Sequence, residues 1–170
     1  PGLDAPVTES DGLTVVHGVE LRVDAGDQRL DLLGYGASRT DELVAELDGL
    51  QAYRVERGRA IVANVESALG IDLDVDVGPG FGRPDVARAV ASHPDTDYDV
   101  QAVFDDLIAD GASAYVARDV PTFERGRDLL ASACAVVGLA HPLRYDDPAG
   151  ALERTASLDA VELYYPYEDD

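Results

Sequence analysis

The sequence predicts an α/β fold, in which short β-strands and α-helices alternate along a chain of one domain's length. The chain has 170 residues, of which 46% are hydrophobic, and this is enough apolar material to close a core. Runs rich in β-branched and apolar residues lie near both ends, whereas the middle repeats its apolar residues at helical spacing. Strands that are apolar and alternate with helices are typical of a parallel sheet or a parallel barrel.

Two strands are expected near the start of the chain. The run "LTVVHGVELRV" at 13–23 is rich in β-branched residues, and "QRLDLLGYG" at 28–36 is predicted as a second strand. The four residues "DAGD" between them have the composition of a turn.

A helical arm is expected over residues 40–112. Thr40, followed by two acidic residues, supplies a helix start, and Gly49 and Gly58 can divide the helical pattern into two helices. Apolar residues with helical spacing run through this part of the chain: Leu43, Leu47, Leu50, Ile61, Val62, Val65 and Leu69. A loop at 70–84 then leads to helices at about 84–92 and 99–110.

The alternation of strand and helix resumes after the arm. "SAYVA" is expected as a short extended segment, and 121–133 as a helix. "AVVGLAH" is then predicted as a buried strand, 148–157 as a helix and "AVELYYP" as a last strand.

Charge and composition exclude several classes of protein. The formal net charge is −21, and all 13 basic residues are arginine, as in the acidic, solvated surfaces of proteins from very salty cytoplasm. Stable binding of duplex nucleic acid is not expected, since the arginines are scattered among acids. The single Cys134 excludes an intramolecular disulfide, and no apolar run is long enough to span a membrane. We expect a cytoplasmic protein and, because the chain opens on "PGLDAP" without methionine, a fragment.

Polar residues in or directly after the predicted strands are the candidate site residues. Parallel α/β folds place their chemistry at the carboxyl ends of strands, where loops and helix amino termini converge. His141 follows the buried strand "VVGLA", Glu20 is the polar residue of "VVHGVEL", and Glu162 lies in a similar strand. An imidazole and a carboxylate together are what a hydrolytic divalent-metal site needs.

Several separated motifs together resemble one known family. They are "VVHGVELRVDAGDQRLDLLGYG", "GFGRPDVARAV", "FDDLIADGASAYVARDVPTFERGRDLL", "VVGLAHPLRY" and "LDAVELYYPY". In order and spacing they resemble the PHP (polymerase and histidinol phosphatase) family of metal-dependent phosphoesterases. The resemblance is greatest to the branch that hydrolyses nucleoside 3′,5′-bisphosphates and trims short RNA or DNA from the 5′ end. It covers essentially the whole chain, and several motifs agreeing in order make it specific.

The resemblance implies a fold and a metal site. The fold would be part of a distorted seven-stranded β/α barrel, with residues 1–39 as its first part, 40–112 as an inserted helical arm and 113–170 as its continuation. Glu20 would bridge the metals, His141 would be a ligand, and both would be catalytic. Asp85 stands where the family's "RPH" motif has a histidine, and a carboxylate there can still ligate Mn²⁺, Mg²⁺ or Fe²⁺ but makes Zn²⁺ less suitable. Equally, Asp85 fits an acidic residue in the first turn of a helix.

The resemblance also implies substrate contacts and missing ligands. Arg118 and Arg144 would contact phosphate, although pairing with surface acids is the alternative for both. The substrate would be a small nucleotide or a short single-stranded oligonucleotide, and Mn²⁺ is the expected metal. The family's opening "HxH" and "DH" ligands and its closing aspartate and histidine lie outside this sequence. Activity is therefore expected in a longer parent protein, and the alternative is a non-catalytic PHP-like interaction or structural module.

Overall fold

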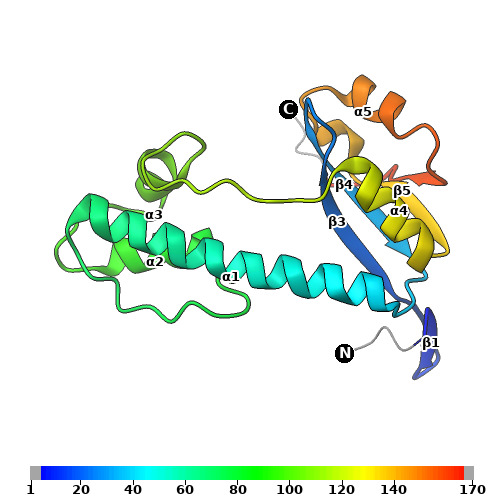
Figure 1. Ribbon diagram of the computed structural model, residues 1–170, viewed down its shortest axis with the longest axis horizontal. Coiled ribbons are helices and arrows are strands. Elements are labelled where there is room, and N and C mark those ends of the chain that lie inside the picture. The colour runs from blue at the N-terminus through cyan, green and yellow to red at the C-terminus, as the bar shows by residue number, and fades with distance from the viewer. Residues whose placement is uncertain (1–4, 167–170) are drawn as a thin grey trace. The chain divides into compact units, whose positions relative to one another are not determined.

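The computed structural model describes residues 5–166, and these divide into two compact units. The sheet unit comprises Pro1–Glu46 and Val120–Asp170, and the helical unit comprises Leu47–Asp119 (Figure 1). Among the described helices, none combines the length and apolar character needed to cross a bilayer.

A four-stranded sheet forms the centre of the sheet unit. Its strands are β3 (Gly18–Asp24), β4 (Arg29–Tyr35), β5 (Val136–Leu139) and β6 (Ala160–Val161), and they lie side by side in the order β3-β4-β5-β6. The first two pairs are antiparallel, and only β5 and β6 are parallel. The predicted mixture of strands and helices is confirmed, but the prediction of an all-parallel sheet is wrong.

Connection length explains the directions of the pairs β3–β4 and β5–β6. Four residues separate β3 from β4, and a link this short can join only antiparallel neighbours, since a parallel pair needs a crossover of about a dozen residues or more. Such a crossover does join β5 to β6, through the 3₁₀ turn η2 (Pro142–Arg144) and helix α5 (Pro148–Arg154). No closed barrel is present within residues 5–166.

A separate hairpin replaces the first half of the long strand predicted at 13–23. The strand breaks at His17, and β2 (Leu13–Val16) pairs with β1 (Val7–Ser10) instead of joining the larger sheet. Asp11 and Gly12, which link β1 to β2, both have positive φ, of 50° and 79°. Asp-Gly with positive φ at both positions is the favoured two-residue hairpin turn.

Helix α4 (Phe123–Ala133) packs against one face of the sheet. Thr122 caps it by accepting a hydrogen bond from the Arg125 amide, and Gly126 allows close approach, because an added Cβ there would overlap a Val23 methyl group. The buried apolar side chains of this part of the unit include Leu21, Val23, Leu30, Leu32, Phe123, Leu129, Leu130, Val137 and Leu139.

Strand alternation turns other side chains toward the opposite face. In β3, Leu21 and Val23 are buried, so Glu20 and Arg22 point away from them. In β4, Asp31 lies between the buried Leu30 and Leu32 and is therefore on the face that carries Glu20 and Arg22. The sheet thus separates an apolar face under α4 from a face with charged side chains.

The helical unit contains most of a single long helix, α1 (Asp41–Leu69), where the sequence left room for two. Gly58 does not break this helix. A Cβ at Gly58 would lie 3.0 Å from a Val77 methyl carbon and 3.2 Å from the Phe81 ring, so the glycine lets the loop after α1 pack against the helix. Close packing against this loop, rather than a turn in the chain, explains why position 58 is a glycine.

Two further helical segments complete this unit. They are α2 (Arg83–Ser92) and a turn of α-helix, α3 (Val100–Ala102), that continues as the π-helix η1 (Val103–Ile108). The core beneath them contains Ile61, Val62, Val65, Leu73, Val86, Val90, Val103, Leu107 and Ile108. The extended segment predicted at "SAYVA" forms no strand.

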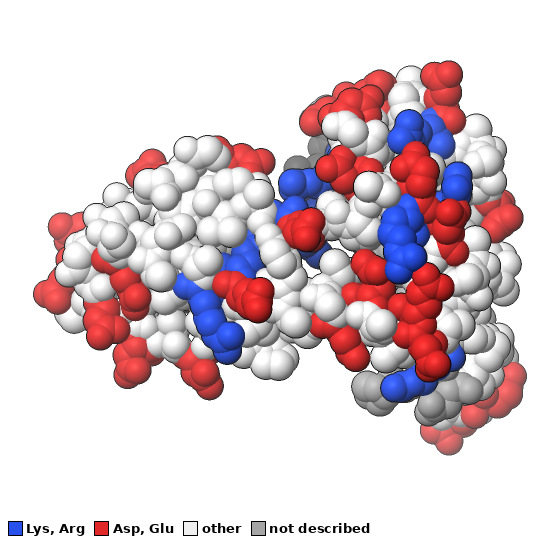
Figure 2. Space-filling view, in the orientation of Figure 1, with Lys and Arg blue, Asp and Glu red and all other residues white. Residues whose placement is uncertain are grey.

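Acidic side chains are spread over both units on the face shown in Figure 2, with arginines among them. Several arginines of the sheet unit pair with acids: Arg125 with Glu42 and Glu46, Arg127 with Asp128, and Arg154 with Glu124. Such exposed pairs contribute little to stability. On this face the positive charge lies in small groups rather than in one continuous basic surface.

Candidate metal site

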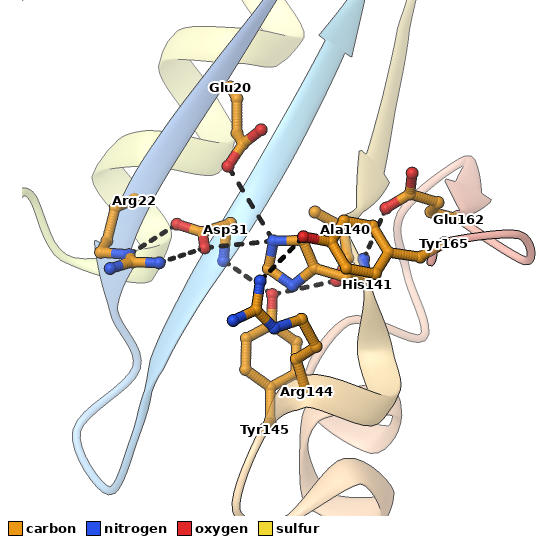
Figure 3. Close-up of polar contacts among 9 residues, drawn as sticks. All are labelled: Glu20, Arg22, Asp31, Ala140, His141, Arg144, Tyr145, Glu162 and Tyr165. Atoms are coloured by element: carbon orange, nitrogen blue, oxygen red, sulfur yellow. Dashed lines mark hydrogen bonds and ion pairs between the residues drawn. The ribbon is translucent and has the colours of Figure 1, made fainter. Parts of the chain in front are cut away.

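Two carboxylates and an imidazole converge on the charged face of the sheet (Figure 3). Glu20 comes from β3, Asp31 from the neighbouring β4, and His141 from the loop directly after β5. The Nε2 atom of His141 lies 3.4 Å from an oxygen of Asp31 and 3.9 Å from an oxygen of Glu20. One ligand atom from each of the three residues lies within 4.8 Å of the other two. The structure therefore brings together both ligands predicted in this unit and adds a third residue.

Asp31 is the most buried member of this cluster, with a side chain 3% exposed. Its two carboxylate oxygens accept hydrogen bonds from Nε and Nη2 of Arg22, which lies directly opposite it on β3. This fork satisfies a buried charge that would otherwise be costly. The hydrogen bond to Asp31 also raises the pKa of Arg22 above its ordinary value. Asp31 is thus a rigid carboxylate held from one side.

His141 has an uncommon backbone conformation that aims its ring at the carboxylates. Its φ is 26°, in a region that L-residues other than glycine rarely adopt. The backbone amide of His141 donates a hydrogen bond of 2.8 Å to the Glu162 carboxylate, just after β6, and Pro142 begins a 3₁₀ turn directly afterwards. The sequence placed Glu162 in a strand similar to that of Glu20, and in the structure it holds the backbone of His141.

Tyr145 links β4 to the residue that follows β5, next to the cluster. Its hydroxyl accepts a hydrogen bond from the Asp31 amide and donates one to the Ala140 carbonyl oxygen. Burial raises the pKa of Tyr145 to about 12. The hydroxyl therefore remains a donor throughout the neutral range and keeps the backbone of Asp31 next to that of His141.

Replacing Tyr145 by phenylalanine is expected to lower the free energy of unfolding at neutral pH by about 1–3 kcal/mol, because an amide and a carbonyl lose their partner. The raised pKa also predicts an alkaline effect. Unfolded tyrosine ionises near pH 10 and folded Tyr145 only at about 12, so the folded chain loses stability as pH rises between these values. Urea unfolding at pH 7 and pH 11 measures both effects. The exposed Tyr35 provides a control as Tyr35→Phe, and equal losses in the two variants would contradict the role of Tyr145.

Arg144 lies beside His141 and contacts an aromatic ring. Its guanidinium donates a hydrogen bond to the Tyr165 hydroxyl and sits 5.5 Å from the centre of the Tyr165 ring. The Tyr165 ring in turn meets the His141 ring edge-on at 5.1 Å. Arg118, the other arginine predicted to bind phosphate, lies in the helical unit. The roles of both arginines in substrate binding stay predictions.

Asp85 also lies in the helical unit, in the first turn of α2. One of its carboxylate oxygens accepts a hydrogen bond from the Gly82 amide and the other from Arg88. The hydrogen bond from Gly82 is the largest cause that lowers the pKa of Asp85. These contacts are those of an acidic residue at a helix amino terminus, and a role as metal ligand stays a prediction.

Replacing Asp85 by alanine is expected to lower the melting temperature, because the Gly82 amide loses its partner at the start of α2. The affinity for Mn²⁺ is expected to stay within about twofold of the wild type, since a cap acts on stability alone. Calorimetric titration and thermal unfolding measure the two quantities. A large loss of Mn²⁺ affinity at unchanged stability would instead establish Asp85 as a ligand.

Asp31 was not singled out as a site residue by the sequence, and the predicted turn does not lead to its partner. The hairpin link is Ala25–Gln28, one residue later than the turn predicted at "DAGD", and this register places Arg22 opposite Asp31. A turn at 24–27 would instead place Arg22 opposite Arg29. Both registers put Asp31 on the face of Glu20, and an acid on that face is the signal that would have identified it. In isolation, however, a single acid in "RLDLL" is typical of a strand with one solvent-facing side chain.

The chemistry of the three side chains fits a divalent cation. The distances from Nε2 to the carboxylate oxygens are too long for strong hydrogen bonds, but they suit donors that share a cation. Two carboxylate oxygens and one imidazole nitrogen suit Mn²⁺ or Fe²⁺, and three protein ligands leave positions open for water or substrate. Nδ1 of His141 is buried without a hydrogen-bond partner, so Nε2 is the nitrogen with access to the site.

Comparisons with known proteins support the fold. No protein-family model and no curated protein matches the sequence. An amidohydrolase from Chromobacterium violaceum, solved with bound sulfate and no metal, is similar with a TM-score of 0.64 and 24% identity. A protein assigned as a metal-dependent phosphoesterase from Bifidobacterium adolescentis is similar with a TM-score of 0.66 and 18% identity. Both matches cover 85% of this chain, which spans 55% and 56% of those two chains.

At these identities the similarity shows a shared fold and leaves the activity open. The chain therefore has a mixed α/β fold that also occurs in an amidohydrolase and in a protein assigned as a phosphoesterase. Membership of the PHP family and of its nucleotide-hydrolysing branch stays a prediction.

Proposed function

We propose that this protein is a metal-dependent phosphoesterase whose divalent cation, Mn²⁺ in preference to others, is bound by Glu20, Asp31 and His141. The observation that carries the proposal is the convergence of these three side chains from separate elements of the sheet unit. A buried acid, an exposed acid and an imidazole at one point suit a catalytic metal better than a structural role. The reason is that the distances of 3.4 and 3.9 Å from the imidazole to the two carboxylates are too long for strong hydrogen bonds within the cluster.

Phosphate esters are proposed as the substrates, in particular nucleotides or short single-stranded oligonucleotides. The two solved structures with a similar fold, an amidohydrolase and a protein assigned as a phosphoesterase, support the proposal of a hydrolase. The amidohydrolase was solved with bound sulfate, a tetrahedral anion shaped like phosphate. Arg144, next to His141, supplies a guanidinium suited to a phosphoryl group. The scattered arginines of the surface favour a small substrate over duplex nucleic acid.

The residues of the site differ in how firmly they are held, and their proposed roles differ accordingly. Asp31 is buried and doubly held by Arg22, and His141 is held through its backbone by Glu162, so both are preorganised. The side chain of Glu20 is 57% exposed and therefore free to adjust. The bound cation would supply a water of lowered pKa and polarise the phosphoryl oxygen. Arg144 would neutralise charge on the phosphoryl group, and the ring of Tyr165 holds its guanidinium beside His141.

Metal binding and phosphate release together test this proposal. Mn²⁺ is titrated calorimetrically into the 170-residue chain at high salt, which screens the acidic surface, and into its Glu20→Ala variant. The full-length protein encoded by the gene, with and without Glu20→Ala, is assayed with Mn²⁺ on nucleoside 3′,5′-bisphosphates. We expect a site that disappears in the variant, and phosphate release that falls with it. If neither quantity changes, the proposal is wrong and a non-catalytic interaction module takes its place.

A further inference from the structure

We propose that Arg22 is a built-in counter-cation of the metal site, which weakens the binding of a divalent cation by the Glu20, Asp31 and His141 cluster. This inference rests on the proposed metal site and concerns a residue that is not itself a ligand. It assigns to Arg22 a role in setting the affinity of the cluster through Asp31.

Contacts on opposite sides of the Asp31 carboxylate carry this inference. The guanidinium of Arg22 donates to both carboxylate oxygens, whereas Nε2 of His141 approaches one of them from the other side (Figure 3). Each carboxylate oxygen has two lone pairs, so the fork leaves a second lone pair free on the oxygen that faces His141. Arg22 and a cation can thus share Asp31, and the fork favours binding through a single oxygen.

The charges of the cluster predict the direction of this effect. Glu20 and Asp31 contribute two negative charges, and Arg22 returns one positive charge through the fork. With neutral His141, one divalent ion would give the assembly a net charge of about +1, which suits an anionic substrate. Without the charge of Arg22, the cation would meet two uncompensated negative charges, so its binding would tighten.

The exposed fractions of Arg22 and Asp31 explain why their ion pair weakens cation binding. The side chain of Asp31 is 3% exposed, so its charge needs a partner when no cation is present. The side chain of Arg22 is 43% exposed, so the fork is sheltered on the side of Asp31 and open to water on the other. A cation that binds Asp31 must share a carboxylate already neutralised by Arg22, and its affinity falls accordingly.

The experiment compares calorimetric Mn²⁺ titrations of four variants with the wild type at high salt. Arg22→Gln removes the charge, and Arg22→Lys keeps the charge but not the fork. Arg125→Gln is the matched control, because it removes one arginine from an ion-pair cluster elsewhere in the sheet unit. Glu20→Ala identifies which binding belongs to the cluster.

We expect cluster-dependent Mn²⁺ binding in the wild type and about tenfold tighter binding in Arg22→Gln, as expected for the loss of one nearby positive charge. Arg22→Lys and Arg125→Gln should stay within about threefold of the wild type, since both leave a positive charge at position 22.

Other results would overturn the inference in distinguishable ways. Equal or weaker binding in Arg22→Gln would show that Arg22 serves only to orient Asp31. If Arg22→Gln does not fold, a tenfold or greater loss of Mn²⁺ affinity in Arg22→Lys would likewise show that Arg22 serves only to orient Asp31. If Glu20→Ala binds Mn²⁺ like the wild type, the proposed metal site fails, and the role of Arg22 fails with it.

Discussion

Replacing His141 by alanine is expected to lower the Mn²⁺ affinity of the chain by more than about 100-fold. Loss of an outer partner of a metal ligand costs about 10–100-fold, and loss of the ligand itself should cost more. Nε2 of His141 is the only nitrogen donor in the cluster, and the two carboxylates alone lack the arrangement of three donors that leaves a catalytic position open. Calorimetric titration of the chain and phosphate release by the full-length protein measure the loss.

His17 provides a matched control for this variant. It is another histidine of the sheet unit, but its ring meets Thr8 on the β1–β2 hairpin. His17→Ala should retain wild-type affinity. If both variants lose the same affinity, or if His141→Ala loses none, His141 is not a ligand.

Replacing Asp31 by asparagine is the second change with a large expected effect, and it acts on both binding and stability. The variant keeps the shape of the side chain but removes the charge, so Mn²⁺ affinity should fall by about 100-fold or more. The free energy of unfolding without metal should fall by about 1–3 kcal/mol, because the hydrogen bonds from Arg22 lose their charged acceptor. Half-exposed Arg22 can return to water, which keeps this loss below that of a fully buried pair.

Urea unfolding without metal and Mn²⁺ titration measure the two effects of Asp31→Asn. Asp27, exposed in the β3–β4 turn, offers the control Asp27→Asn, which should change neither quantity. A variant that loses stability but binds Mn²⁺ normally would show that Asp31 belongs only to the ion pair. Unchanged stability together with lost Mn²⁺ binding would show that the ion pair of Arg22 with Asp31 contributes little to the free energy of unfolding.

The type and order of most elements could be predicted from the sequence, because local periodicity and turn chemistry determine them. Apolar spacing predicted the helical segment that contains α1, and runs of apolar or β-branched residues predicted β3, β4 and β5. Errors arose where a local pattern has more than one structural solution. Gly58 was compatible with a helix break or a close contact, and the run at 13–23 was compatible with one strand or two.

The candidate site could be predicted in part, for a related reason. Glu20 and His141 stand out as polar residues in or directly after apolar strands, and this made them candidates. Asp31 does not stand out in the same way, because its role depends on the pairing of β4 with β3 on one side and with β5 on the other. Asp85 matches a family motif in sequence, yet its two oxygens are engaged at the start of α2.

By itself, then, the sequence determined that this protein alternates strands with helices, that its surface is acidic, and which histidine follows a buried strand. These properties depend on composition and on residues close to one another in the chain. Only the tertiary structure decided that Asp31 lies between Arg22 and His141, and that Glu162 holds the backbone of His141. The reason is that β5 pairs with β4 across the whole intervening helical segment, and strand register, set by long-range packing, decides which side chains meet.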